Sequence, residues 1–145
     1  MEIVRIVNTV FSSNTYVLRE EGMDWCWLVD VGDIDPVLEC IGGEVTIRGV
    51  FLTHTHYDHL YGINRLIDLF PQCVVYTSGA GVEGIYSDKL NFSRYHDDPV
   101  VFKGVWLFGQ NDMWINQMCL PFFQFGETVC DMLADGRSNF HLFAG

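Results

Sequence analysis

Apolar and polar positions alternate along residues 2–10 and again along residues 14–19, with the turn-like cluster "SSN" between the two runs. A period of two is typical of β-strands, so this stretch predicts a β-hairpin. A further apolar run, Trp25–Asp33, predicts a third strand that ends in a glycine-containing turn.

The pattern then changes to an alternation of helices and strands. Asp35 in a cap position, Pro36 at a first helical position and the glycine pair at 42–43 predict a short helix. Residues 45–53 are rich in β-branched side chains and predict a strand, whereas residues 59–70 carry apolar positions at helical spacing. Another apolar run, 73–77, predicts the next strand, and beyond about residue 78 the pattern weakens to short apolar runs with turns between them. Such an order favours a layered α/β fold, which binds ligands at the carboxyl ends of its strands.

Length and charge narrow the classes of function. A chain of 145 residues fits a single domain spanning 1–145. Its formal net charge of −11 disfavours nucleic acid and anionic membranes as partners. The amino terminus lacks the apolar core of a signal peptide, and no run approaches the roughly 18 apolar residues of a membrane span. The five cysteines are widely spaced and odd in number, as expected for reduced core residues of a cytoplasmic protein.

The segment "FLTHTHYDHL" (51–60) concentrates candidate metal ligands directly after a predicted strand: His54, His56, Asp58 and His59. A lone histidine is usually a hydrogen-bonded core residue, and Asp58 is also placed to cap a helix beginning near His59. Four candidate ligands within six positions favour a metal site over this structural explanation. So tight a turn suits two adjacent divalent ions better than one tetrahedral zinc.

This segment resembles the H-x-H-x-D-H signature of the metallo-β-lactamase fold, which "THTHYDH" matches at every defined position. The upstream stretches "NTYVL" and "WLVDVGD" are similar to the family's opening hairpin and to its strand ending in aspartate and glycine. The resemblance covers roughly residues 2–100 and extends to glyoxalase II-like hydrolases. It implies an α/β fold of the αββα sandwich type, with a one- or two-metal site at one edge. The metal is usually zinc, with iron and manganese as alternatives.

The resemblance also implies roles for individual residues. His54 and His56 would bind one metal ion, Asp58 and His59 a second, and Asp30 would support these ligands without binding metal itself. A metal-bound hydroxide would then attack the carbonyl of a small thioester, ester or lactam substrate. Asp58 would be the catalytic residue that orients this water and handles its proton. On this reading the chain is an enzyme if its metal site is complete.

The chain departs from the family pattern in its last third. In "FGET", Glu127 stands where the family has a histidine, so it is a further candidate ligand, although a surface glutamate in a turn explains it equally well. The chain stops at Gly145, where the family would continue with a bridging aspartate. The resemblance therefore implies a truncated, split or altered domain, incomplete at its carboxyl end. Asp135 and His141 are substitutes of lower rank, and a second copy of the chain or another polypeptide would complete the fold.

Two other readings remain open. One is a catalytically impaired or partial module of the same fold, acting in metal binding or protein interaction. The other rests on "SGAGVEG", in which Gly79, Gly81 and Gly84 have the G-x-G-x-x-G spacing of a dinucleotide-binding loop after a strand. Asp97 and Asp98 lie near the distance expected for a ribose contact, but they do not end an apolar strand. Nucleotide binding therefore ranks behind metal-dependent hydrolysis.

Overall fold

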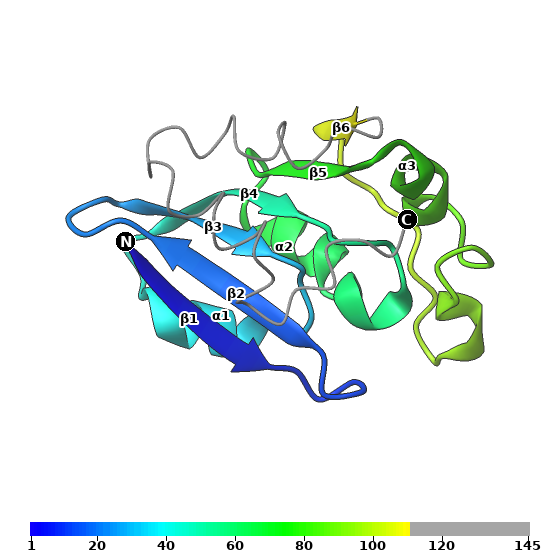
Figure 1. Ribbon diagram of the computed structural model, residues 1–145, viewed down its shortest axis with the longest axis horizontal. Coiled ribbons are helices and arrows are strands. Elements are labelled where there is room, and N and C mark those ends of the chain that lie inside the picture. Colours follow the sequence, from blue (N-terminus) through cyan, green and yellow to red (C-terminus); the bar gives the residue numbers. More distant parts are fainter. Residues whose placement is uncertain (111–145) are drawn as a thin grey trace.

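A computed structural model of the chain describes residues 1–110, which form one mixed β-sheet with helices between its later strands (Figure 1). The strands are β1 (Glu2–Val7), β2 (Asn14–Arg19), β3 (Trp25–Val29), β4 (Thr46–Phe51), β5 (Val74–Ser78) and β6 (Leu107–Gln110). The helices are α1 (Ile34–Ile41), α2 (Ile63–Leu69) and α3 (Gly79–Ile85), with short 3-10 helices η1 (Tyr57–His59) and η2 (Ser93–Tyr95).

The strands lie in the sheet in the order of the chain, β1-β2-β3-β4-β5-β6. The pairs β1–β2 and β2–β3 are antiparallel, whereas β3–β4, β4–β5 and β5–β6 are parallel. Parallel neighbours need a crossover, and α1 and α2 supply the first two. The carboxyl ends of β3, β4, β5 and β6 consequently lie along one edge of the sheet, so the predicted α/β fold class is confirmed.

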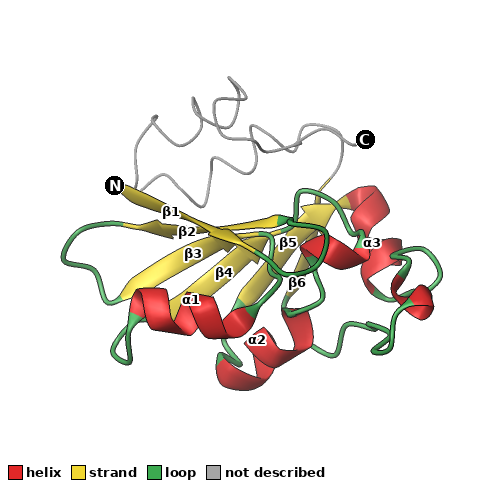
Figure 2. Ribbon diagram, turned by 90° about the horizontal axis from the view of Figure 1, so that it is seen from below, coloured by secondary structure: helices red, strands yellow, loops and turns green. Residues whose placement is uncertain are grey.

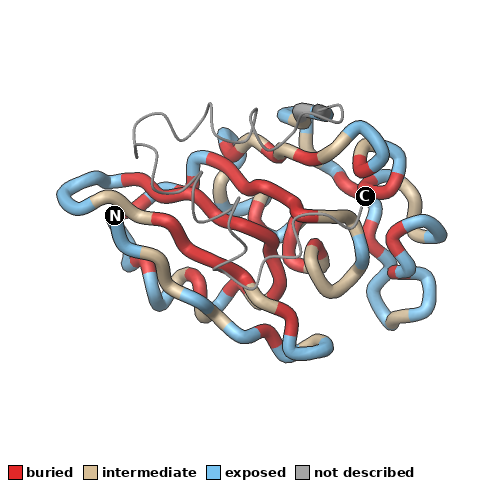
Figure 3. Tube along the Cα trace, viewed as in Figure 1, coloured by how far each residue is buried: buried red, intermediate tan, exposed pale blue. Residues whose placement is uncertain are grey.

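Both faces of the sheet are apolar, and α1 and α2 lie on the same face (Figure 2). Alternate residues of β3 belong to different cores: Leu28 packs towards the helices, while Trp27 and Val29 join an aromatic cluster on the opposite face. The same alternation separates Val50 from Phe51 in β4. Strands buried on both faces have few polar positions, which explains the nearly continuous apolar runs in the sequence. Figure 3 shows these central strands as largely buried.

The start of α1 differs from the prediction. The helix begins at Ile34, with Asp33 as its N-cap residue, rather than after a cap at Asp35. Pro36 is tolerated inside the first turn because the amide groups there have no intrahelical acceptor. The Asp33 carboxylate makes no capping bond and instead accepts hydrogen bonds from the backbone and hydroxyl of Thr9 and from the Tyr61 hydroxyl. The predicted stop is confirmed, because Gly42 ends α1 with a positive φ of 76°.

The helix after the histidine segment also differs from the prediction. Instead of one helix over 59–70, η1 ends at His59 and α2 begins only at Ile63. The loop after β3 lies against this break: the Val31 amide donates to the His59 carbonyl, and the Gly62 amide donates to the Val31 carbonyl. Asp58 lies within η1 and caps no helix through its side chain. Long-range backbone hydrogen bonds therefore override the local helical pattern here.

A close backbone approach accompanies this break. A Cβ atom built on Gly62 would lie 2.1 Å from the Gly32 carbonyl oxygen, which is far inside van der Waals contact. Only glycine fits at position 62, although its φ of −87° suits any residue. This contact fixes the distance between the loop after β3 and the start of α2, which are the two segments that flank the histidine segment.

No helix within residues 1–110 is long and apolar enough to cross a membrane. The predictions on Glu127, Asp135 and His141 concern residues outside the described range.

We expect Gly62→Ala to lower the free energy of unfolding by about 1–3 kcal/mol, because the new methyl group meets a backbone carbonyl that cannot rotate away. Gly43→Ala is the matched control, since a Cβ there meets nothing within 4 Å, and it should change the value by less than about 0.5 kcal/mol. Urea titrations of both variants measure the difference. Equal stabilities would contradict the steric argument.

Candidate metal centre

The candidate ligands lie at the edge of the sheet where the parallel strands end. Asp30 directly follows β3, and residues 53–60, called here the motif loop, follow β4. The Asp30 amide donates to the carbonyl of Phe51, the last residue of β4, at 2.8 Å, which places Asp30 beside the start of the motif loop. The carboxyl edge of the sheet therefore brings Asp30 close to three histidines that follow it much later in the sequence.

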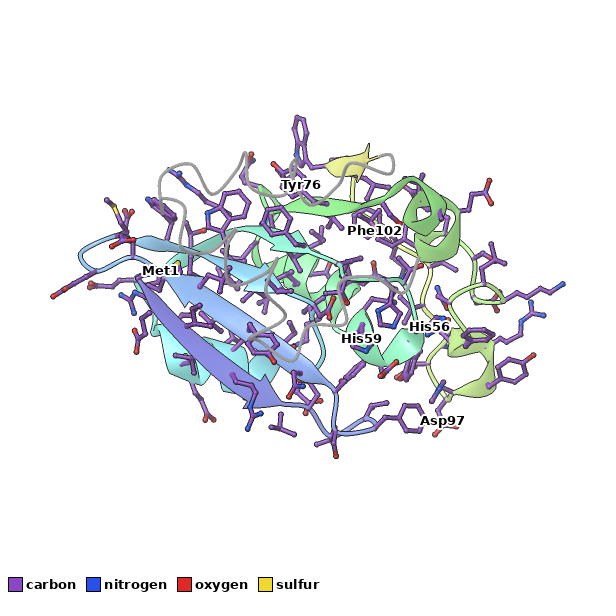
Figure 4. The ribbon with its side chains drawn as sticks, in the orientation of Figure 1. Met1, His56, His59, Tyr76, Asp97 and Phe102 are labelled. Atoms are coloured by element: carbon purple, nitrogen blue, oxygen red, sulfur yellow. The ribbon has the colours of Figure 1, made fainter. Side chains whose placement is uncertain are left out.

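The imidazole of His54 lies against the other two imidazoles of the motif loop. The ring centroid of His54 is 4.6 Å from that of His56 and 4.1 Å from that of His59. Figure 4 shows His56 and His59 close together beyond the end of β4. Asp58 joins the group, since its Oδ2 atom is 3.2 Å from Nε2 of His59. The structure thus brings together all four candidate ligands of this loop.

Asp30 connects this cluster to the core. The residue is 3% exposed, and its carboxylate accepts hydrogen bonds from the Thr53 amide at 2.8 Å and from the Thr53 hydroxyl at 2.8 Å. Its Oδ2 atom also lies 2.7 Å from Nδ1 of His59. The backbone of Asp30 has a φ of 56°, a left-handed conformation that aspartate tolerates better than most residues. This turn ends β3 earlier than the sequence predicts and directs the carboxylate to the motif loop.

The electrostatics of the pair follow from burial and contact. Burial by itself would lower the pKa of His59, but the hydrogen bond to Asp30 and the charges of Asp30 and Asp58 outweigh it, so that pKa is raised. Burial raises the pKa of Asp30, and the hydrogen bonds from His59 and Thr53 oppose that rise. The short contact between the Asp30 carboxyl and Nδ1 of His59 therefore acts on the pKa of both groups, raising that of His59 and opposing the rise that burial causes in Asp30.

The rest of the loop is held by hydroxyl groups. Nδ1 of His54 lies 3.1 Å from the Thr53 hydroxyl. The Ser13 hydroxyl, from the loop between β1 and β2, donates to the Asp58 carbonyl at 2.6 Å. Ser13 itself accepts from the buried amide of Asn8. The backbone of the motif loop is thereby anchored to the hairpin as well as to β3.

The donor chemistry fits a zinc-type ion. Metal-binding histidines usually engage their second ring nitrogen with an oxygen partner, and His54 and His59 both do so. Imidazole and carboxylate are also common zinc ligands. Within residues 1–110, however, no three His, Cys, Asp or Glu side chains form a ready-made group for one ion. Binding would therefore require these side chains to reorient, or a donor from outside the described residues.

The glycines at 79–84 have a packing role that the sequence did not reveal. A Cβ atom on Gly81 would lie 2.0 Å from the Thr77 hydroxyl oxygen, and one on Gly84 would lie 2.2 Å from that of Thr55. Thr55 belongs to the motif loop, so Gly84 allows α3 to lie directly against it. These close contacts explain glycine at positions 81 and 84 without a nucleotide. Asp97 and Asp98 are exposed and follow η2 rather than a strand.

Sequence reasoning missed the threonines and the serine that hold the motif loop. Thr53 stands directly before His54, so its position within "THTH" was the available signal. Ser13 gave no signal, because its partner Asp58 lies 45 residues further along the chain. Hydroxyl groups of this kind are recognisable only once the fold brings distant loops together.

Comparison with known proteins found a family model and several solved structures that are similar to this chain. The family model described as the metallo-beta-lactamase superfamily matches residues 8–127. Among solved structures, the BLEG-1 B3 metallo-β-lactamase is 23% identical with a TM-score of 0.62, over 74% of this chain and 53% of that one. MEM-A1, a subclass B3 metallo-β-lactamase from a soil metagenome library, is 18% identical with a TM-score of 0.51, over 74% and 41%. ETHE1 from Myxococcus xanthus is 25% identical with a TM-score of 0.46, over 52% and 35%.

The likeness to the two B3 proteins shows a shared fold. The chain spans about half the length of the first, 53%, and 41% of the second.

We expect Asp30→Asn to destabilise the metal-free protein by about 1–3 kcal/mol, because an amide cannot accept all of the hydrogen bonds that the buried carboxylate accepts. Asparagine also tolerates the left-handed backbone at this position, so the change tests the carboxylate rather than the conformation. Chemical denaturation measures the effect, with Asp68→Asn on the exposed surface as the control. A stability equal to that of the control would show that Asp30 does not hold the loop.

Proposed function

The chain belongs to the metallo-β-lactamase superfamily, and from this premise we propose that it is a metal-dependent hydrolase of small acyl compounds. The observation that carries the proposal is the gathering of His54, His56, His59 and Asp58 on one loop at the carboxyl edge of the sheet. Proteins of this superfamily generally bind metal ions, usually zinc. The proposed substrate is a thioester, an ester or a lactam.

In this proposal the imidazoles of the motif loop hold the metal. His54 and His56 form one half of the site, while His59 and Asp58 form the other, supported by their separation of 3.2 Å between Nε2 and Oδ2. Zinc is the metal expected, as one ion or two, with iron or manganese as alternatives. Glu127 remains a candidate for a further ligand, at a position outside the described residues.

Asp30 keeps His59 ready for binding. Its contact with Nδ1 opposes rotation of the imidazole and leaves Nε2, which faces Asp58 at 3.2 Å, as the nitrogen that would bind a metal ion. A carboxylate behind a histidine also increases the basicity of that histidine. We therefore assign Asp30 to support the ligands rather than to bind metal.

A bound divalent ion supplies an activated water at neutral pH and polarises the substrate carbonyl. Asp58 lies beside His59 and is partly exposed, so its carboxylate is placed to orient the attacking water and accept its proton. The hydrogen bond from Ser13 to the Asp58 carbonyl fixes the backbone from which this side chain extends. Asp58 is accordingly the proposed catalytic residue.

In a second candidate function, the chain has the same fold but does not catalyse a reaction. The observation that favours it is that residues 1–110 contain no ready-made three-ligand group. In that case the chain is a metal-binding or interaction module, completed by a second copy or by another polypeptide. A cytoplasmic location remains a prediction for either function.

The first test is metal content. We expect the chain, purified without a metal-binding tag, to contain near-stoichiometric zinc by elemental mass spectrometry, and the double variant His54→Ala/His56→Ala to lose it. Chelation with EDTA should remove activity, and added zinc should restore it. A wild-type chain that holds no zinc, iron or manganese, even after each metal is added, would refute the hydrolase and favour the non-catalytic module.

Activity measured at equal metal content separates catalysis from metal binding. We expect Asp58→Asn to lower kcat by about 100-fold or more on any thioester, ester or lactam that the wild-type chain hydrolyses, because the amide cannot accept the proton of the attacking water. The exposed Asp68→Asn is the matched control and should leave kcat unchanged. Equal rates for Asp58→Asn and wild type would remove Asp58 from the mechanism.

A further inference from the structure

The three imidazoles of the motif loop are not supported equally. His54 has the Thr53 hydroxyl beside Nδ1, and His59 has the Asp30 carboxylate there. His56 is exposed, and in the described part of the chain its ring has neither a hydrogen bond nor an ion pair. The ring contacts recorded for His56 are with His54, and with Phe92 at a centroid distance of 5.0 Å and an angle of 66°.

Phe92 has an unusual backbone. Its φ is 65°, in the left-handed region that glycine adopts without steric cost and that a phenylalanine adopts only against its Cβ contacts. Its side chain is 49% exposed, so it buries little apolar surface in return. Neither the backbone nor the core explains why an aromatic residue occupies this position.

The residues on either side of Phe92 impose the conformation. Asn91 and Ser93 are both fully buried. The Asn91 amide donates to the carbonyls of Gly84 and Val100, and the Ser93 hydroxyl accepts from the Val100 amide at 2.7 Å. The Ser93 amide in turn donates to Asn91 Oδ1 at 2.9 Å. With both neighbours fixed inward, the residue between them is directed outward, where its ring meets His56.

A second contact shows that this segment lies along the motif loop. The ring of His96 stacks on that of Tyr57 at a centroid distance of 3.7 Å and an angle of 20°. Tyr57 is the residue after His56, so neighbouring positions of the loop each contact an aromatic ring of the segment 91–96. The contact of Phe92 with His56 is therefore part of an extended interface.

We propose that Phe92 is the positioning residue of His56 and holds its imidazole for metal binding by ring packing, as Thr53 and Asp30 hold the other two by hydrogen bonds. The inference rests on the proposed function, because only there is His56 a ligand. The inference explains the left-handed backbone at position 92 as the conformation that directs the Phe92 ring towards His56. The conformation is unfavourable for folding and is retained for the ring that it presents.

The proposal predicts effects of opposite sign. Phe92→Gly relieves the left-handed strain and removes a half-exposed ring, so the unfolding temperature should stay the same or rise. The same change frees the His56 imidazole, so zinc affinity should fall about 10-fold or more. A residue with a merely structural role would lower stability and affinity together.

The matched control is Phe11→Gly. Phe11 is also a phenylalanine with a positive φ, 52°, and is 75% exposed, but its ring contacts His96 rather than a candidate ligand. We expect Phe11→Gly to leave zinc affinity unchanged. Phe92→Tyr, which keeps the ring, should retain the wild-type affinity.

The experiment uses the full chain and zinc alone. Zinc affinity is measured by competition with a chromogenic chelator, and unfolding by thermal scans of the metal-free protein. Reduced affinity in Phe92→Gly, at equal or higher stability, supports the proposal. Unchanged affinity overturns it, and so does a loss of stability greater than that of Phe11→Gly, which would make the ring a packing element.

Nuclear magnetic resonance of the metal-free protein separates this inference from the proposed function. Ring-proton contacts between His54 and His56, whose centroids are 4.6 Å apart, should be strong in the wild type and weaken in Phe92→Gly. If the wild-type chain binds no zinc, the proposed function fails and this measurement still decides what Phe92 does to His56. Unchanged ring contacts in Phe92→Gly would overturn the positioning role.

Discussion

The buried carboxylate of Asp30 is the interaction on which the rest of the site depends. It lies at the end of β3, and through Thr53 and His59 it binds both the start and the later part of the motif loop. A carboxylate with 3% exposure is unfavourable unless hydrogen bonds satisfy its oxygens, so the loop and the aspartate stabilise each other. Without this carboxylate, the loop that carries the histidines would lose the hydrogen bonds that hold it in one conformation.

Close approaches of the backbone extend this arrangement. Gly62 touches the Gly32 carbonyl on one side of the motif loop, and Gly84 touches Thr55 on the other. The Asn8–Ser13 contact adds a third attachment through the hairpin. The parallel sheet supplies the edge, and these small or polar residues allow the loops to approach closely enough for side chains from several strands to meet.

Support for the imidazoles decreases from the core outward. His59 is held by a buried carboxylate and His54 by a hydroxyl, whereas the exposed His56 lies beside an aromatic ring. Two residues with a left-handed backbone, Asp30 and Phe92, direct their side chains to this cluster from segments far apart in the sequence. Strained backbone at two such positions is consistent with a fold that gives up some stability to place side chains at one edge of the sheet.

The sequence by itself determined the class of the fold and the identity of the clustered residues. Strand β2 has the predicted bounds, and Gly42 ends α1 as predicted, because a period of two and a helix-stopping glycine are local signals. His54, His56, Asp58 and His59 are close in space because they are close in sequence. Asp30 was singled out because it follows an apolar strand within a segment similar to the family's.

Only the tertiary structure determined which residues contact and hold each side chain of the site. The start of α1 was predicted wrongly, because the helix begins after Asp33 rather than after Asp35. The Asp33 side chain binds Thr9 and Tyr61, and these contacts span 24 and 28 residues. Contacts between residues distant in sequence also account for the break before α2, the role of Gly84 and the contact of Phe92 with His56. Periodicity and capping act within a few residues, whereas these contacts form only when the sheet aligns the ends of its strands. The sequence could therefore name the residues of the site, and the fold determines what holds each one.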